Sequence, residues 1–386
     1  MPPVLFLQSD VQDPYAGYAG MLRENPVYWD DKNKLWAVYS YKGCVSILTN
    51  PAAHIPSINQ NNKDGLNEYA LLIAGHVARL SNNIQHTIAR EIAMLLFQNV
   101  KNISIKSIAD KLLQDQNNPA ETDFVHSICK RLPVMVVLKS FDFDDKAVDF
   151  ICGRMERLVN IMLVVKTAEQ VKHINEVAGE IYVITEKHIL ATGIHRSIIK
   201  LLNGKYGVGP GELIAACICN LVGLFIQAYD AGRGVLSNTL LQILTNDTTE
   251  LNITDKVFIE KWVIETLRFN PPVQNTRRIA AENILLDNAE IKQGESILVV
   301  LAAANRDPET FNLPTVFDIK RSNNAEHLTF GFGHHQCVAK QFSVYMATET
   351  LAYFFYRYKI KLVERVIEYE PLVNVRLPRE ILISLA

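Results

Sequence analysis

The stretch FGFGHHQCVAK, from Phe330 to Lys340, places two glycines, two histidines and a single cysteine directly before an amphipathic run. Glycine readily adopts the left-handed backbone of a tight turn, so a turn is expected at Gly331 and Gly333. The amphipathic run predicts a helix that begins beside Cys337 and points its unbonded N–H groups and positive end at the sulfur. Such a helix end favours the thiolate form of a cysteine.

Other interpretations of this stretch have weaker support. A dinucleotide-binding turn would need a third glycine where Gln336 stands and a preceding strand in a βαβ unit. A zinc site from His334, His335 and Cys337 would need a fourth ligand and a spacing that lets all of them converge. A buried, inert cysteine is the simple alternative that composition allows. A stabilised, singly presented thiolate is what an axial haem ligand requires.

The stretch resembles the haem-binding loop of the cytochrome P450 family, whose pattern is F-G-x-G-x-H-x-C-x followed by G or A. The matching residues are Phe330, Gly331, Gly333, His335, Cys337 and Ala339. The resemblance implies that Cys337 ligates the iron of haem b, iron protoporphyrin IX, and that the other residues help to hold this cofactor. It extends over nearly the whole chain, from DPYAGYAGMLRENPVYW near the start through ANRDP at 304–308 to the terminal strands.

Length and composition predict one large globular domain. The 386 residues are 48% hydrophobic, and no linker, charge block or repeat divides them, so a single domain over 1–386 is expected. The resemblance implies that it is a haem domain without a fused reductase. A formal charge of -2 argues against nucleic-acid binding. The four apolar residues between Pro3 and Gln8 are too few for a signal peptide or a membrane span, and the six cysteines contain no C-x-x-C pair. A cytoplasmic protein with no membrane attachment is expected.

Most of the chain has helical periodicity, and strand-like pieces are few and short. Helices are expected over 84–97, 124–139, 212–244 and 255–269, with Pro133 breaking the second of them. Strands are expected within 34–41, 284–301 and 376–385. The segment 55–83 is expected to be a long loop with short helical turns. The predicted class is mostly α with small β-sheets, and the resemblance implies the cytochrome P450 fold.

Charged pairs outside the cysteine loop also match the family. Glu265 and Arg268 stand at i and i+3 of a predicted helix, so they can form an ion pair, and they match the E-x-x-R structural lock. A surface salt bridge is the simpler interpretation of that pair alone. The family often adds an Arg or His to the lock. Here the matching position is Val316, and Arg321 is the candidate substitute.

The resemblance also assigns the side chains that hold the haem propionates. His86 and Arg90, one turn apart on a predicted helix, match the H-x-x-x-R pair that grips one propionate. Arg278 matches the other propionate position, with Arg277 as an extra charge, and His335 is a further candidate. Arginine suits this role because its planar guanidinium matches a carboxylate.

The long apolar segment 212–244 resembles the family's central helix, which crosses the oxygen-binding face of the haem. Aligning its end places Gln227, Asp230 and Ala231 over the iron. The acid of the family pattern survives as Asp230, whereas Ala231 replaces the usual threonine and Gln227 replaces a small residue. The substrate pocket is expected to include Val273, Gln274 and Asn275, and its polar groups predict a small organic substrate with hydrogen-bonding groups.

The resemblance implies a soluble, bacterial-type haem-thiolate monooxygenase that uses O2 and electrons from a separate ferredoxin or flavodoxin. Such enzymes are typical of secondary metabolism. The alanine at 231 favours an alternative, a haem-thiolate oxidase or peroxygenase that couples or dehydrogenates its substrate without inserting oxygen. A binding scaffold without catalysis is a third hypothesis, and the cysteine loop argues against it.

Overall fold

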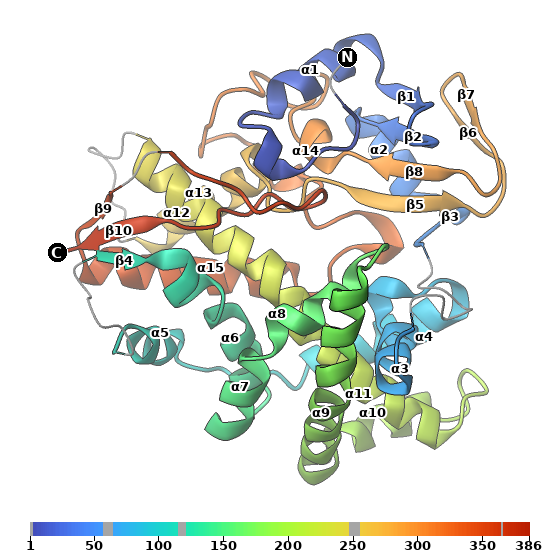
Figure 1. Ribbon diagram of the computed structural model, residues 1–386, viewed down its shortest axis with the longest axis vertical. Coiled ribbons are helices and arrows are strands. Elements are labelled where there is room, and N and C mark those ends of the chain that lie inside the picture. Colours follow the sequence, from blue (N-terminus) through green and yellow to red (C-terminus); the bar gives the residue numbers. More distant parts are fainter. Residues whose placement is uncertain (1–2, 57–64, 115–120, 247–254, 364–365) are drawn as a thin grey trace. The chain divides into compact units, whose positions relative to one another are not determined.

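The computed structural model describes residues 3–56, 65–114, 121–246, 255–363 and 366–386. The chain forms two compact units. Figure 1 shows its helices and strands. Unit 1 comprises Met1–His54, Ile105–Leu132 and Asp230–Ala386, and unit 2 comprises Ile55–Ser104 and Pro133–Tyr229. The single domain over 1–386 stays a prediction. Most described residues are helical and the sheets are small, so the predicted secondary-structure class is confirmed.

Unit 1 contains the sheets and the helices that pack on them. Its main sheet has the order β1 (Val27–Asp30), β2 (Leu35–Val38), β8 (Ser296–Val299), β5 (Thr276–Ala280) and β3 (Ala53–His54). Strands β2 and β8 run parallel, and the other neighbours run antiparallel. A second sheet has the order β4 (Glu121–Asp123), β10 (Leu382–Leu385) and β9 (Ile360–Leu362), and β6 (Ile284–Leu286) pairs with β7 (Ala289–Ile291).

Strand β8 is buried on both faces because helices cover the main sheet from two sides. Ile297 and Val299 point into a core with α2 (Tyr41–Thr49), whereas Leu298 points into a core with α1 (Tyr15–Glu24) and α14 (Leu301–Ala304). The other helices of unit 1 are α5 (Ile105–Gln114), the π-helix Val125–Cys129, α12 (Arg233–Thr245), α13 (Lys256–Phe269) and α15 (Lys340–Arg357). Helices α12, α13 and α15 pack against one another.

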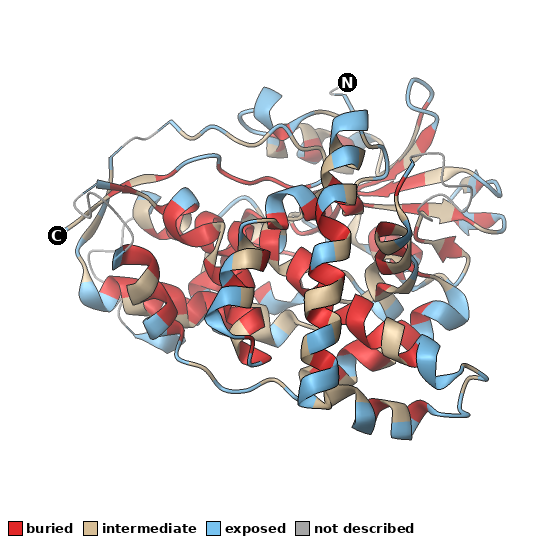
Figure 2. Cartoon of the chain, turned by 60° about the horizontal axis from the view of Figure 1, so that its bottom comes forward, coloured by how far each residue is buried: buried red, intermediate tan, exposed pale blue. Residues whose placement is uncertain are grey.

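Unit 2 is built around α11 (Pro210–Gln227), which packs against α3 (Glu68–His76), α4 (Asn83–Phe97) and α9 (Ala168–Thr192). Its remaining helices are α6 (Leu132–Ser140), α7 (Asp145–Cys152), α8 (Met155–Leu158) and α10 (Ile194–Leu202). Short 3-10 turns in the two units lie at Gln8–Asp10, Ala78–Leu80, Val159–Met162, Asn324–Glu326 and Gly333–His335. Buried and exposed residues alternate around the helices, as expected for amphipathic elements (Figure 2).

One prediction about the helices is wrong and another is confirmed. The segment 55–83 contains α3, with Asn67 capping the helix through the N–H of Ala70. The apolar periodicity of α3 is weak because this short helix packs on both α9 and α11. The predicted break near Pro133 is a turn at residues 130–131, which separates the π-helix Val125–Cys129 from α6, where Pro133 is the second residue. A proline at a helix start costs no hydrogen bond, since the first N–H groups have no partner there. Residues 57–64 of the predicted loop lie outside the described residues.

The predicted central helix is continuous from Pro210 to Thr245, with α11 and α12 joined by the π-helix Ala228–Gly232. Within the residues that the structure describes, this stretch is the one helix long and apolar enough to span a membrane, and 67% of its most apolar window is buried inside the protein. It also carries the buried Arg233, whose Nη2 lies 3.0 Å from Oε1 of Glu370. Core burial therefore accounts for its apolar character.

Candidate functional site: the cysteine loop and the charges around it

Cys337 lies at the end of a tightly hydrogen-bonded loop in unit 1. The N–H of Gly331 donates to Leu328 O at 2.7 Å, and the N–H of Cys337 donates to Phe330 O at 2.8 Å. Gly331 and Gly333 have φ angles of 71° and 68°, as the sequence predicted. A Cβ at residue 333 would lie 2.9 Å from Leu48 O, so glycine is also required there for space.

Cys337 differs from the cysteines of the core. Burial raises the pKa of the Cys217 thiol to about 12, and it also raises the pKa of the Cys44, Cys129 and Cys219 thiols. Those four are protonated, unreactive thiols at neutral pH. Cys337 is half-buried, which the interpretation as an inert core cysteine does not predict. Within the described ranges, no three His, Cys, Asp or Glu side chains are grouped as metal ligands, so the zinc interpretation gains no support.

The helix after the loop begins later than the sequence suggested. Helix α15 starts at Lys340, with Ala339 as its N-terminal cap residue, rather than beside Cys337. The intervening Val338 and Ala339 complete the loop. His335, the predicted propionate partner within the loop, is half-buried, and its ring centroid lies 4.8 Å from that of the exposed His334.

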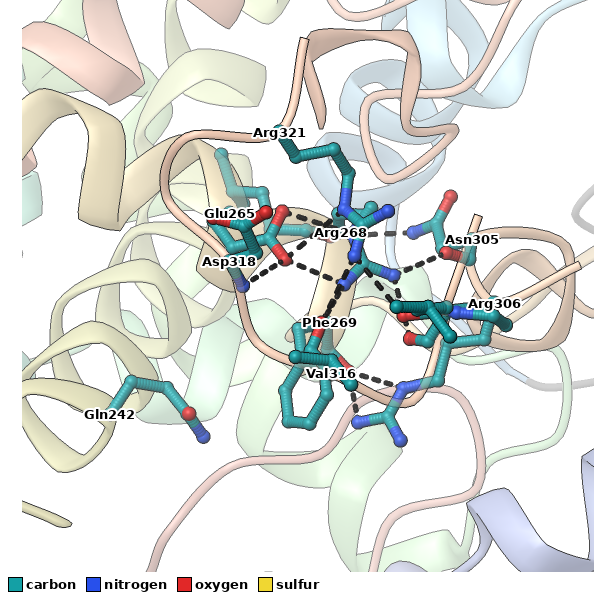
Figure 3. A network of polar contacts seen from close by, with 12 residues as sticks. Gln242, Glu265, Arg268, Phe269, Asn305, Arg306, Val316, Asp318 and Arg321 are labelled. Carbon is teal, nitrogen blue, oxygen red and sulfur yellow. Dashed lines mark hydrogen bonds and ion pairs between the residues drawn. The ribbon is translucent and has the colours of Figure 1, made fainter. Parts of the chain in front are cut away.

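Arg268 is fully buried and uses all five of its N–H groups (Figure 3). Nε and Nη2 donate to the two carboxylate oxygens of Glu265 at 2.9 and 2.6 Å. Nη1 donates to Asn305 O at 3.1 Å and Pro314 O at 3.0 Å, and Nη2 also donates to Val316 O at 3.1 Å. The pair is therefore a buried bidentate ion pair and not a surface salt bridge. It joins the end of α13 to two segments far away in the sequence.

Arg321 supplies the third charged side chain of the lock, in place of the uncharged Val316. Its Nε lies 3.6 Å from Glu265 Oε1, although the two do not form a hydrogen bond. The N–H of Asp318 donates to the same carboxylate oxygen at 2.9 Å. The Val316 side chain is 48% exposed, and only its carbonyl takes part, accepting from Arg268 and Arg321. The candidate substitute, Arg321, is therefore in contact with the lock.

The predicted propionate-binding cations lie in both units, and each unit is described by itself. In unit 1, Arg278 on β5 is 3% exposed, and its Nη1 donates to Thr276 Oγ1 at 3.0 Å and Arg277 O at 2.8 Å. Burial lowers the pKa of the neighbouring Arg277 guanidinium. In unit 2, His86 is buried on α4 and Arg90 is half-buried one turn later. The Nδ1–H of His86 donates to Ala78 O at 2.9 Å, which fixes the orientation of the ring.

The residues predicted to lie over the iron occur at the π-helix of the central helix. Gln227, in unit 2, is half-buried, and its Nε2 donates back to Gly223 O at 3.0 Å. Asp230 and Ala231 belong to unit 1, where Asp230 is half-buried and Ala231 is exposed. The π-helix Ala228–Gly232 makes the central helix irregular at this point. Gly234, one turn later, is required for packing because a Cβ there would lie 2.4 Å from Pro272 Cβ.

The predicted pocket residues of unit 1 differ in what their side chains contact. Gln274 is fully buried, donates from Nε2 to Pro271 O at 2.6 Å, and accepts at Oε1 from the hydroxyl of Tyr18 at 3.5 Å. Its amide is engaged inside unit 1, so we leave Gln274 out of the proposed pocket. Asn275 Nδ2 donates to Val373 O at 3.0 Å, and Val273 forms a β-bridge with Val375. These two remain pocket candidates.

The lock makes a strong prediction about stability. Glu265→Gln removes the counter-charge of a fully buried guanidinium, which should cost about 3 to 5 kcal/mol of unfolding free energy. Arg268→Lys keeps the charge but supplies three donors for five acceptors, so it should also destabilise the protein. Urea unfolding followed by circular dichroism measures both losses.

Asp31→Asn is the matched control because it also removes one negative charge from an ion pair, but from an exposed one with Lys34. It should unfold at the same urea concentration as the wild type. A Glu265→Gln protein as stable as Asp31→Asn would contradict the buried-lock interpretation.

Comparisons with known proteins agree with this site. A sequence model of the cytochrome P450 family matches residues 241–382, the part that contains the lock and the cysteine loop. The biotin biosynthesis cytochrome P450 of Bacillus subtilis (strain 168) is 39% identical over 142 residues, which cover 36% of this chain and 35% of that protein. Cytochrome P450 119 of Sulfurisphaera tokodaii is 27% identical over 90% of this chain and 93% of its own length.

The same family appears among solved structures. P450BioI, solved in complex with acyl carrier protein ligated to hexadec-9Z-enoic acid, matches with a TM-score of 0.81, covers 97% of this chain and 99% of its own, and is 22% identical. This match confirms the predicted fold. Members of the family bind haem b and act as oxidoreductases, chiefly monooxygenases. The chain thus has the fold of the cytochrome P450s over nearly its whole length, and its residues 241–382, which contain the lock and the cysteine loop, match the sequence model of that family.

Proposed function

We propose that this protein is a haem-thiolate monooxygenase that oxidises a small organic molecule carrying polar groups. The observation that carries the proposal is the Cys337 loop, in which the two left-handed glycines and the Phe330–Cys337 hydrogen bond present one half-buried thiol. A binding scaffold would not need such a thiol, and its partial exposure distinguishes it from the four cysteines buried in the core.

The residues present fit haem b. Cys337 would supply the axial sulfur, and Arg278, His86 and Arg90 would supply cationic donors for the propionates, with His335 as a further one. The shape of the loop that would hold the cofactor depends on Phe330, Gly331, Gly333 and Ala339. When bound, haem supplies the redox chemistry that activates O2. The protein's own residues hold the cofactor, orient the substrate and deliver protons.

Proton delivery is the step in which this chain departs from its family. Inserting one oxygen atom into a substrate and releasing the other as water consumes two electrons and two protons. Ala231 has no hydroxyl to position a water for this transfer. Gln227 is a poor substitute because one of its amide N–H groups is engaged with Gly223 O. The remaining proton donors are the carboxyl group of Asp230, acting through water, and a hydroxyl or amine of the substrate, and we propose that they act together.

This arrangement makes selectivity part of the reaction. Only a molecule carrying the polar group completes the proton path, so analogues without it would bind but release reduced oxygen unproductively. Asn275 and Val273, both in unit 1, are the proposed pocket residues, and Asn275 would add a polar contact. Electrons would come from a separate ferredoxin- or flavodoxin-type protein, and the proposed location is the cytoplasm. The proposed partners include neither nucleic acid nor a membrane.

One second function is favoured by a specific observation, the alanine at 231. Without a hydroxyl at residue 231, the enzyme would act as a haem-thiolate oxidase or peroxygenase that couples or dehydrogenates its substrate without oxygen insertion. The two functions differ in whether an atom of O2 enters the product, which mass spectrometry of products formed under ¹⁸O2 determines.

The first prediction concerns thiolate ligation. The reduced, haem-loaded protein should form a carbon monoxide adduct with the red-shifted Soret band of a thiolate ligand, and Cys337→Ala should abolish that band. Cys152→Ala is the matched control because Cys152 is the other half-buried cysteine, and it should leave the band intact. A wild-type protein that stays colourless after haem supplementation would contradict the proposal.

The second prediction concerns Ala231. With a true substrate, oxygen consumption should be well coupled to product in the wild type, whereas analogues lacking the polar group should mostly yield peroxide. Ala231→Thr should improve coupling for those analogues more than for the substrate, because the added hydroxyl restores a water site. Electron consumption, peroxide and product are measured for each compound in each protein.

Ala231→Val controls for size, since valine has the shape of threonine without its hydroxyl, and it should give no such gain. If the wild type works only with added peroxide, or its products contain no atom from O2, the oxidase or peroxygenase function replaces the monooxygenase.

A further inference from the structure

Asn305 links the buried lock to the start of the cysteine loop. It follows α14 and is fully buried. Its backbone carbonyl accepts from Arg268 Nη1, which ties it to the lock. Its side-chain Oδ1 accepts from the N–H of Leu328 at 2.6 Å, and its Nδ2 donates to Thr329 Oγ1 at 2.9 Å. One residue thus contacts both the lock and the two residues that precede Phe330.

The contacts of Asn305 close a ring with the last turn of α13. Leu267 O accepts from Nδ2 of Asn305 at 3.3 Å and from the hydroxyl of Thr329. Leu267 directly precedes Arg268, so the same helical turn anchors the lock and the ring. The hydroxyl of Thr329 uses its proton for Leu267 and a lone pair for Asn305. The ring is largely shielded from competition by solvent, because Asn305 and Leu267 are fully buried and Thr329 is 6% exposed.

The segment held by this ring continues directly into the loop. Both backbone polar groups of Leu328 are hydrogen-bonded. Its N–H donates to Asn305 Oδ1, and its carbonyl accepts from the N–H of Gly331. Two residues after Leu328, the carbonyl of Phe330 accepts from the N–H of Cys337. A shift of residues 328–329 therefore moves the acceptor that holds Cys337. Burial lowers the pKa of His327 to about 3, so its ring stays neutral and Nδ1 accepts from the Thr329 N–H at 3.2 Å.

We propose that Asn305 is a positioning residue. By holding Leu328 and Thr329 against the end of α13, it fixes the position of the Cys337 sulfur. This inference rests on the proposed role of Cys337 as the haem ligand. Asn305 does not touch the haem or the substrate in this account. Its function is to transmit the rigidity of the Arg268 lock to the loop, so that the sulfur keeps one position when the cofactor binds and the iron changes its charge.

The test compares three variants of the full-length chain. Asn305→Ala removes the side-chain contacts to Leu328, Thr329 and Leu267. Thr329→Val removes only the hydroxyl from the ring, and Thr329→Ser restores it. Asn238→Ala is the matched control, because Asn238 is also fully buried in unit 1 and donates to two backbone carbonyls, those of Asn270 and Arg376, but has no contact with the loop.

Two readouts separate positioning from general stability. In the reduced, haem-loaded proteins, the ratio of the red-shifted carbon monoxide adduct to the unshifted one reports thiolate ligation. It should fall about tenfold in Asn305→Ala, since at least one net hydrogen bond to a buried group is lost. In the haem-free proteins, the rate of iodoacetamide alkylation at Cys337, located by mass spectrometry, should rise.

Asn238→Ala should lower the melting temperature but leave both readouts as in the wild type, and Thr329→Ser should recover what Thr329→Val loses. An Asn305→Ala protein that melts early yet keeps the wild-type adduct ratio and alkylation rate would overturn the proposal. If Asn305→Ala does not fold, a Thr329→Val protein with unchanged readouts overturns it equally. A wild type without the red-shifted band instead rejects the proposed function itself.

Discussion

The buried guanidinium of Arg268 is the contact on which the cysteine side of unit 1 depends. Its five N–H groups meet five acceptors, two on Glu265 and three on the backbone of residues 305, 314 and 316. A buried charge is costly unless every donor is satisfied, so these segments can take few other positions. The ion pair is therefore better understood as a device that specifies geometry than as a large net source of stability.

The geometry matters because a haem ligand must be presented singly and at a fixed position. The loop achieves this with backbone conformation, through two glycines in the left-handed region and close approach of Gly333 to Leu48 O. Asn305 connects the loop to the lock. Local turn conformation and long-range anchoring thus act on the same thiol, which lies outside the core that holds Cys44, Cys129, Cys217 and Cys219.

The sequence predicted what depends on local chemistry. Its glycines, cysteine and E-x-x-R spacing indicated the loop and the lock, because each reflects a constraint within a few residues. It named Arg321 only as a candidate for the third charge of the lock, in place of the uncharged Val316. Arg321 reaches Glu265 through the tertiary course of residues 312–321, which the local sequence does not specify. Gln274 was expected in the pocket, but its contact with Tyr18 spans 256 residues of sequence and has no local signal. Asn305 stood in the quoted ANRDP motif, yet only the structure showed its contacts.

The helices show the same limit. Helix α3 was missed because its apolar residues face two neighbours, which removes the periodicity on which the prediction relied. Gly234 of the central helix has a role that only packing reveals, because a Cβ there would lie 2.4 Å from Pro272 Cβ. Site residues in unit 2, such as His86, are placed by bonds within that unit, here to Ala78 O.

Iron K-edge X-ray absorption on the purified, haem-loaded protein tests the central claim, that Cys337 is the sulfur ligand of the haem iron. The account predicts one sulfur atom in the first coordination shell of the iron in the wild type and in Cys152→Ser. It predicts none in Cys337→His. A wild-type iron with only nitrogen and oxygen neighbours, or a sulfur that persists in Cys337→His, would contradict it.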